Sequence, residues 1–189
     1  NIAMSFTENS YEKALITLYE NLGYQYLYGP DIARDYYTAF YEEQLVNSLT
    51  KINPTKSYTA IDEAITKLKN IETGSLVQKN ELFMDYLQHG IEISYHDGVK
   101  QHNDIIYLID FNNIYRNDFQ VINQWTFVEH SEKRADIIIF INGLPLIIIE
   151  LKSPSREETD ASEAYRQLRN YMKEIPSLFI YNVFCIMSD

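Results

Sequence analysis

The chain has 189 residues, of which 46% are hydrophobic, and its formal net charge at pH 7 is −11. This length and composition exclude a disordered linker and predict one folded domain with a sizeable core, and the acidic balance argues against a general nucleic-acid binder. The apolar runs are shorter than the roughly 20 residues that a membrane helix requires, and no secretion signal is visible. We therefore expect a cytoplasmic protein with no membrane partner, which suits a single cysteine, Cys185, that cannot form an internal disulfide.

The N-terminal half of the chain has mostly helical spacing. A first helix is predicted at residues 7–22, with Gly23 as its stop. Three more are predicted at about 32–51, 58–71 and 76–89, broken near Asn53-Pro54 and Thr73-Gly74. Because residues 31–90 hold no cluster of groups that suggests chemistry, we interpret them as a helical insertion and a docking layer.

The hydrophobic period changes at residue 91. Strands are predicted at 91–95, 105–111, 119–128, 136–141 and 144–151, because these segments are rich in β-branched and aromatic residues. An amphipathic helix follows at about 157–174, ended by Pro176, and then a buried strand at 178–187. We expect one domain over residues 1–189, with its core in 5–28 and 91–189. A chain that stops on a core strand also suggests the N-terminal fragment of a longer protein.

Three ionisable groups interrupt two aliphatic runs between residues 134 and 152. Asp136 opens the first run, and Glu150 and Lys152 close the second. Carboxylates are the hard oxygen ligands that Mg²⁺ requires, and Mg²⁺ takes one or two of them while keeping waters and substrate phosphate. Lys152 shares a strand face with Glu150, because the two are separated by two positions, so its ammonium could orient an attacking water. The stretch predicts a Mg²⁺-dependent phosphodiester hydrolysis site.

Sharing one ion requires both carboxylates to lie on one face of the hairpin. A regular two-residue Asn142-Gly143 turn would place Asp136 and Glu150 on opposite faces. A three-residue loop at 141–143, with Gly143 left-handed, would pair Asp136 with Ile148 and bring Glu150 to the same face. We therefore predict the three-residue loop, or a compensating bulge near Asp136.

The joint pattern resembles the PD-(D/E)xK nuclease superfamily. Asp136 is followed after thirteen residues by Glu150-Leu151-Lys152, although Ala135 stands where that motif has proline. On the following helix, Gln167 and Tyr171 match the Gln-x-x-x-Tyr motif of the RecB-like branch. The segments NGLPLIIIELK and IYLIDFNNIYRNDFQVINQWTF, with the opening helix, look like the N-terminal endonuclease domain of the R (restriction) subunit of type I restriction-modification enzymes.

The resemblance implies an α/β fold with a restriction-endonuclease-like core, which is a mixed central sheet flanked by helices, here with an inserted helical segment. It implies catalytic roles for Asp136, Glu150, Lys152, Gln167 and Tyr171, and metal binding by Asp136, Glu150 and the Leu151 main-chain carbonyl. It adds Glu12 of the first helix to the catalytic and metal site, with Glu8 as the fallback. The candidate DNA-binding residues are Lys133, Arg166, Arg169 and Lys173.

The same resemblance implies partners and cofactors outside this chain. They are double-stranded DNA, the modification and specificity subunits, and an ATP-driven translocase that follows in the same polypeptide, with ATP and S-adenosylmethionine used only by the full complex. Two alternatives stay open. The chain could be another PD-(D/E)xK nuclease of DNA repair or recombination, or a degenerate nuclease fold that serves as a docking module.

Overall fold

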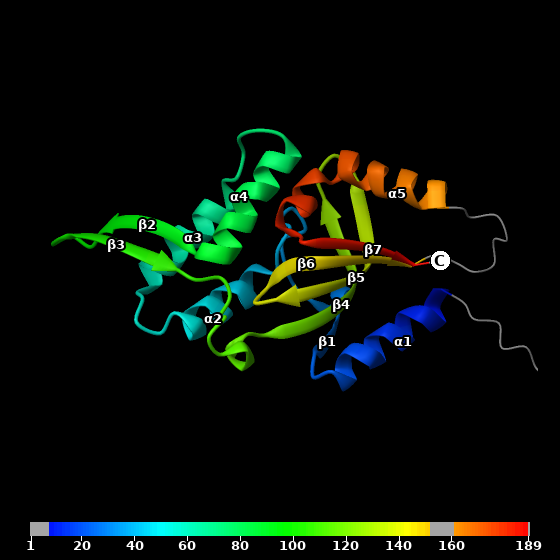
Figure 1. Ribbon diagram of the computed structural model, residues 1–189, viewed down its shortest axis with the longest axis horizontal. Helices are drawn as coiled ribbons and strands as arrows, with labels where there is room; N and C mark the ends of the chain where they lie inside the picture. The colour runs from blue at the N-terminus through cyan, green and yellow to red at the C-terminus, as the bar shows by residue number, and fades with distance from the viewer. Residues whose placement is uncertain (1–7, 152–160, 189) are drawn as a thin grey trace, which may run out of the picture.

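The computed structural model describes residues 8–151 and 161–188. In chain order, and with η for a 3₁₀ helix, its elements are α1 (Glu8–Asn21), β1 (Gln25–Tyr28), η1 (Gly29–Asp31), α2 (Glu42–Ile52), α3 (Tyr58–Lys69), α4 (Leu76–His89), β2 (Ile91–His96), β3 (Gln101–Ile106), η2 (Ile114–Arg116), β4 (Phe119–Val128), β5 (Glu132–Ile141), β6 (Leu144–Leu151), α5 (Ala161–Glu174), η3 (Pro176–Tyr181) and β7 (Phe184–Ser188) (Figure 1). Within these ranges, no helix is both long enough and apolar enough to cross a membrane.

A mixed five-stranded sheet forms the centre of the fold, in the order β1-β4-β5-β6-β7. Strands β4, β5 and β6 are antiparallel neighbours, whereas β1 runs parallel to β4 and β7 runs parallel to β6. Helices lie on both sides of this sheet (Figure 1). The predicted fold class, an α/β fold with a mixed central sheet flanked by helices, is confirmed.

Alternate residues of the central strands pack against different helices. Ile137 and Ile139 of β5 belong to a small core with Ile16 of α1. Ile138 and Phe140 point to the opposite face, where they join the main core with the helical insertion and η3. Helix α5 covers part of this second face through partly buried apolar side chains. Because both faces are covered, β5 and β6 read as continuous apolar runs.

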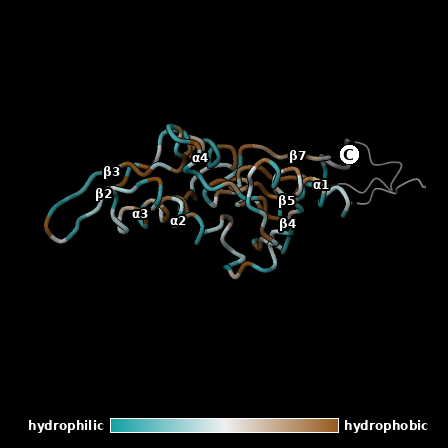
Figure 2. The backbone as a smooth tube through the Cα atoms, turned by 90° about the horizontal axis from the view of Figure 1, so that it is seen from below, coloured by the Kyte–Doolittle hydropathy of each residue, from teal (hydrophilic) through white to brown (hydrophobic). Residues whose placement is uncertain are grey.

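Helices α2, α3 and α4 form a layer beside the sheet, together with a separate two-stranded sheet made of β2 and β3. The β2–β3 hairpin packs on α3, and the Lys56 ammonium lies 2.7 Å from the Asp104 carboxylate across that contact. In both views the hairpin projects away from the central sheet (Figures 1 and 2). The strand predicted at 105–111 is corrected, because β3 ends at Ile106 and does not join the central sheet.

Two other predicted elements differ from the structure. The helix predicted at 32–51 begins only at Glu42, because the Asp35 carboxylate accepts hydrogen bonds from the Tyr37 N–H, at 2.8 Å, and the Thr38 hydroxyl, at 3.3 Å, which fix a turn. The strand predicted at 178–187 is shortened, because residues 176–181 form η3 and only residues 184–188 form β7. Four consecutive buried residues, 178–181, made that 3₁₀ segment look like a strand.

The remaining differences are smaller. Strand β1 was not predicted, because its four residues, QYLY, give too short a pattern. Helices α3 and α4 lie where the helical spacing predicted them. The described part of α5 begins at Ala161, so the predicted residues 157–160 lie outside the described ranges.

Candidate active site

The β5–β6 hairpin turns through two residues rather than the predicted three. Ile141 pairs with Leu144, so Asn142 and Gly143 alone form the turn. Both have left-handed backbones, with φ of 53° for Asn142 and 82° for Gly143, as a type I′ turn requires. The three-residue loop is therefore a wrong prediction.

A bulge in β6 supplies the register shift that the loop was expected to supply. Phe140 pairs with Pro145, but Ile139 pairs with Ile147, which leaves Leu146 as the extra residue. Proline has no N–H to donate and is tolerated at such bulges. The bulge lies near the turn rather than near Asp136, where it was predicted.

The shifted register brings the two carboxylates to one face. Ile137 pairs with Ile149. Asp136 and Glu150 are the neighbouring residues on the two strands, so they lie opposite each other on the same face of the sheet. They share the face of Ile138 and Ile148, which belong to the main core. The requirement for a shared ion is therefore met by a different backbone device.

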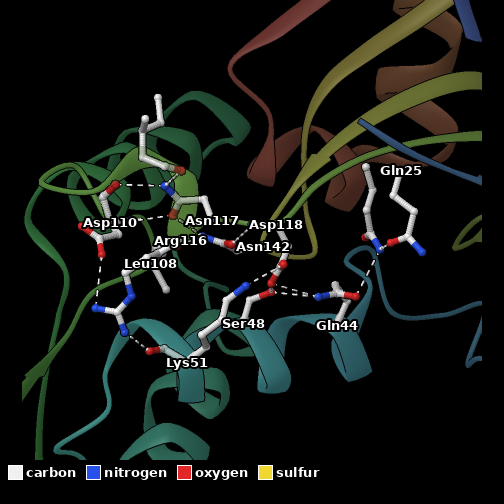
Figure 3. A network of polar contacts seen from close by, with 12 residues as sticks. Gln25, Gln44, Ser48, Lys51, Leu108, Asp110, Arg116, Asn117, Asp118 and Asn142 are labelled. Carbon is white, nitrogen blue, oxygen red and sulfur yellow. Dashed lines mark hydrogen bonds and ion pairs between the residues drawn. The ribbon is translucent and has the colours of Figure 1, made fainter. Parts of the chain in front are cut away.

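The turn is fixed by a polar network that ties it to the helical insertion (Figure 3). The Asn142 side chain is fully buried; it accepts from the Asp118 N–H at 2.8 Å and donates to the carbonyl of Leu108 at 2.8 Å and to Oδ1 of Asn117 at 2.9 Å. The Asp118 carboxylate in turn accepts from the Ser48 hydroxyl of α2 at 2.6 Å. The insertion therefore fixes the turn end of the hairpin that carries both carboxylates.

Asp136 and Glu150 are in direct contact at the other end of the hairpin. The Leu151 N–H donates to Oδ2 of Asp136 at 2.8 Å, and the carboxyl groups of Asp136 and Glu150 lie in contact with each other. Glu150 is only 5% exposed. Burial raises the pKa of Asp136, and the negative charge of Glu12 adds to the rise. Two neighbouring carboxylates repel each other, so a cation bound between them would relieve the repulsion.

Helix α5 brings the predicted Gln167 and Tyr171 to these carboxyls. The Tyr171 hydroxyl hydrogen-bonds to Glu150 and accepts from Nε2 of Gln167 at 3.4 Å. Burial raises the pKa of the Tyr171 hydroxyl, as do the charges of Glu150 and Asp136. Two residues that are four apart on the helix thus form a relay of hydrogen bonds to Glu150.

Glu12 approaches from the opposite face of the sheet, on α1. Its carboxylate accepts from Nδ2 of Asn123 at 2.6 Å and from Nε2 of Gln124 at 3.2 and 3.3 Å, and it lies close enough to Asp136 to influence that group. The side chain of Glu8 lies outside the described residues. Sequence analysis missed Asn123 and Gln124, although an amide pair within the apolar run VINQWTF could have drawn attention to them.

The structure does not show the other predicted residues at this cluster, and for Lys152 it gives no position. Lys152 lies outside the described residues. Lys133 is half-buried on β5, three positions before Asp136, and Arg166, Arg169 and Lys173 are exposed on α5. Nη1 of Arg169 donates to the Tyr165 hydroxyl at 3.1 Å, so this guanidinium has a partner on its own helix.

The oxygen atoms at the end of β5 and β6 fit a hard divalent cation. In residues 8–151 and 161–188, no three His, Cys, Asp or Glu side chains form a cluster that could hold a metal ion. Two carboxylates and a neighbouring main-chain carbonyl are nevertheless a donor set that Mg²⁺ accepts, because Mg²⁺ keeps several waters. Asp136, Glu150 and the Leu151 carbonyl therefore stay the predicted ligands of a cation.

The chain is similar to known proteins over nearly its whole length. A family described as "Type I restriction enzyme R protein N terminus" matches residues 5–189. The type I restriction enzyme HindI endonuclease subunit of Haemophilus influenzae is 33% identical over 192 residues, covering 96% of this chain and 18% of the relative. The putative type I restriction enzyme MjaIXP endonuclease subunit of Methanocaldococcus jannaschii is 29% identical over 188 residues, covering 94% and 18%.

A third relative, the type I restriction enzyme EcoprrI endonuclease subunit of Escherichia coli, is 33% identical over 168 residues, covering 78% of this chain and 53% of the relative. The chain spans less than a fifth of the length of the first two relatives. Because the family match extends over residues 5–189, the chain belongs to the type I restriction enzyme R protein N-terminus family.

Proposed function

We propose that the chain is the Mg²⁺-dependent endonuclease domain of a type I restriction enzyme R subunit and hydrolyses phosphodiester bonds of double-stranded DNA. The observation that carries the proposal is the contact between the Asp136 and Glu150 carboxyls on adjacent strands, with Tyr171 of α5 hydrogen-bonded to Glu150. The family match and the endonuclease subunits among the relatives support the same activity.

Asp136, Glu150 and the Leu151 carbonyl would hold the cation. Bound there, Mg²⁺ would neutralise charge on the phosphate and supply an activated water. The Leu151 N–H at 2.8 Å would keep the Asp136 carboxylate in place.

The surrounding side chains would orient these ligands and the attacking water. Tyr171, supported by Gln167 at 3.4 Å, would fix the rotamer of the Glu150 carboxylate. Lys152 would orient the water and offset the negative charge that develops on the phosphate. Glu12 would add negative charge on the α1 side of Asp136.

DNA binding by this chain alone would be weak, because its net charge is −11. Lys133, Arg166, Arg169 and Lys173 would contact phosphates near the site. The rest of the assembly would deliver the DNA, namely an ATP-driven translocase with the modification and specificity subunits in the cytoplasm. ATP and S-adenosylmethionine would be used by those parts rather than by this chain.

Alanine substitutions in the assembled enzyme test the proposal. Asp136→Ala, Glu150→Ala and Lys152→Ala should each abolish DNA cleavage while ATP hydrolysis continues, because only the nuclease site loses its groups. Asp62→Ala removes an exposed carboxylate from α3 and should leave cleavage unchanged. If all three site variants still cut DNA, the proposal is wrong. Wild-type chain that binds neither Mg²⁺ nor Mn²⁺ in calorimetry would instead favour a docking module.

A further inference from the structure

We propose that Asn123 and Gln124 are positioning residues of this site, whose side-chain amides hold the Glu12 carboxylate beside Asp136. The inference rests on the function proposed above and assigns a task to two residues that are not among the predicted catalytic groups. Three features of β4 carry it, which are its register with β5, its backbone at Gln124, and the hydrogen bonds to Glu12.

The register puts Gln124 directly across from Asp136. Asn123 pairs with Ile137 and Trp125 pairs with Ala135, so the position between them faces Asp136. Asn123 points to the α1 face, because its partner Ile137 belongs to the core that α1 covers. The two amides therefore flank the end of the sheet at which the carboxylates meet.

The backbone at Gln124 is strained in a way that the fold maintains. Its φ is 50°, and among the described residues only Asn142 shares a positive φ without being glycine. Glutamine has no local compensation for this conformation, which costs roughly 1 kcal/mol or more. Gly29 allows it, because a Cβ atom at Gly29 would collide with the carbonyl oxygens of Asn123 and Gln124. A strained residue opposite a catalytic candidate is a reason to look for a role.

Glu12 receives hydrogen bonds from both amides. Asn123 donates to Oε1 at 2.6 Å, and Gln124 donates to Oε1 and Oε2 at 3.3 and 3.2 Å. The Tyr26 hydroxyl donates to Oδ1 of Asn123 at 3.1 Å, which turns the Nδ2 of Asn123 toward Glu12. Asn123 is 6% exposed, so its amide has little freedom to turn away. We call Asn123 and Gln124 the amide clamp.

The clamp opposes an electrostatic repulsion. The negative charge of Glu12 acts on Asp136, and like charges disfavour one another in a half-buried site. Without the amides, the half-exposed Glu12 side chain would turn toward solvent. With them, its charge stays near Asp136 while both of its oxygens are engaged. The clamp would therefore strengthen the attraction of the site for a divalent cation without making Glu12 a direct ligand.

The test uses two variants that tolerate a left-handed backbone. Gln124→Gly removes the side chain and the strain, and Gln124→Asn keeps an amide that is too short to reach Glu12. For the 189-residue chain, we expect both to keep or raise the thermal unfolding midpoint and to weaken Mn²⁺ binding about tenfold in calorimetry. The assembled enzyme should lose cleavage in parallel. Asn103→Ala, on the exposed β3 edge, should change neither property.

A double-mutant cycle separates positioning from a general structural effect. If the clamp acts through Glu12, then Gln124→Gly should cause no further loss of Mn²⁺ affinity in a Glu12→Gln background. Unchanged Mn²⁺ affinity in Gln124→Gly, or equal losses in both backgrounds, would overturn the inference and leave the proposed function standing. Wild-type chain that binds Mn²⁺ no better than Asp136→Ala would overturn the proposed function and the inference together.

Discussion

The two ends of the β5–β6 hairpin handle buried polar groups in opposite ways. At the turn, the fully buried side chain of Asn142 makes three hydrogen bonds, and Asp118 beside it is paired with Lys51 at 2.7 Å. At the open end, the Asp136 and Glu150 carboxyls meet each other. Buried polar groups with partners stabilise a fold, whereas like charges brought together destabilise it.

The difference separates a structural end from a functional end of the same two strands. The turn end contacts the helical insertion and fixes the register, including the bulge at Leu146. The open end uses that register to bring together groups that would repel each other if both were ionised. The stability of the first end therefore makes the second possible, and substitutions at the two ends should have opposite effects on the free energy of unfolding.

The largest effect is expected for Gly143→Ala at the turn end. A Cβ atom at Gly143 would lie 2.6 Å from the Tyr41 carbonyl oxygen and 2.7 Å from the Leu45 nitrogen, and the backbone φ is 82°. Steric overlap and the left-handed backbone should together cost about 4 kcal/mol. Denaturant unfolding of the chain measures the loss.

Gly23→Ala is the matched control, because Gly23 has a φ of 94° and nothing within 4 Å of its Cβ position. It should cost only about 1 kcal/mol, the price of the backbone conformation. Equal losses for the two variants would mean that the contact with α2 does not hold the turn in place.

The two ends of the hairpin also differ in how well the sequence predicts them. The continuous apolar runs predicted β5 and β6, because both faces of these strands are covered, and helical spacing put Gln167 and Tyr171 on one side of α5. The prediction of the turn was wrong because the same sequence is compatible with a two-residue and a three-residue loop. Contact with α2 and the bulge at Leu146 decide between them, and both depend on parts of the chain that are distant in sequence.

The amide clamp was out of reach for a related reason. Asn123 and Gln124 stand in a strand whose pattern predicts burial, and an amide pair alone does not reveal a carboxylate more than a hundred positions away, on α1. The left-handed backbone at Gln124 has no sequence signal either, because glutamine is not favoured there. Geometry that violates local preference becomes visible only in the folded chain.

A smaller effect of opposite sign is expected for Asp136→Asn at the open end. The amide removes the repulsion between the carboxyls and keeps an oxygen that can accept from the Leu151 N–H, at 2.8 Å in the wild type. Without added metal, the chain should become more stable by roughly 1 kcal/mol, the usual scale for relieving a strained functional site. Thermal and denaturant unfolding measure this gain, with Asp62→Asn on exposed α3 as the control.

The same Asp136→Asn variant should lose metal-dependent stabilisation. Mn²⁺ should raise the unfolding midpoint of the wild type and leave that of the variant nearly unchanged, because one ligand has lost its charge. A variant that is less stable than wild type without metal would show that the carboxyl pair supports the fold, and the contrast between the two ends would fail.

The smallest effect is a pH dependence that belongs to the open end alone. Burial raises the pKa of Asp136, so the folded chain binds this proton more tightly than the unfolded chain does. As pH rises from the ordinary Asp value through the raised pKa, the folded state becomes less stable, by at most about 1.4 kcal/mol per pH unit for one proton. Hydrogen bonds from Lys100, His102 and Val99 hold the pKa of Asp97 at about 2. The contribution of Asp97 to stability therefore increases with pH, but it is the same in wild type and in Asp136→Asn. The difference in unfolding free energy between the two proteins should therefore widen with rising pH, and parallel curves between about pH 4 and pH 7 would contradict the burial of a titrating Asp136.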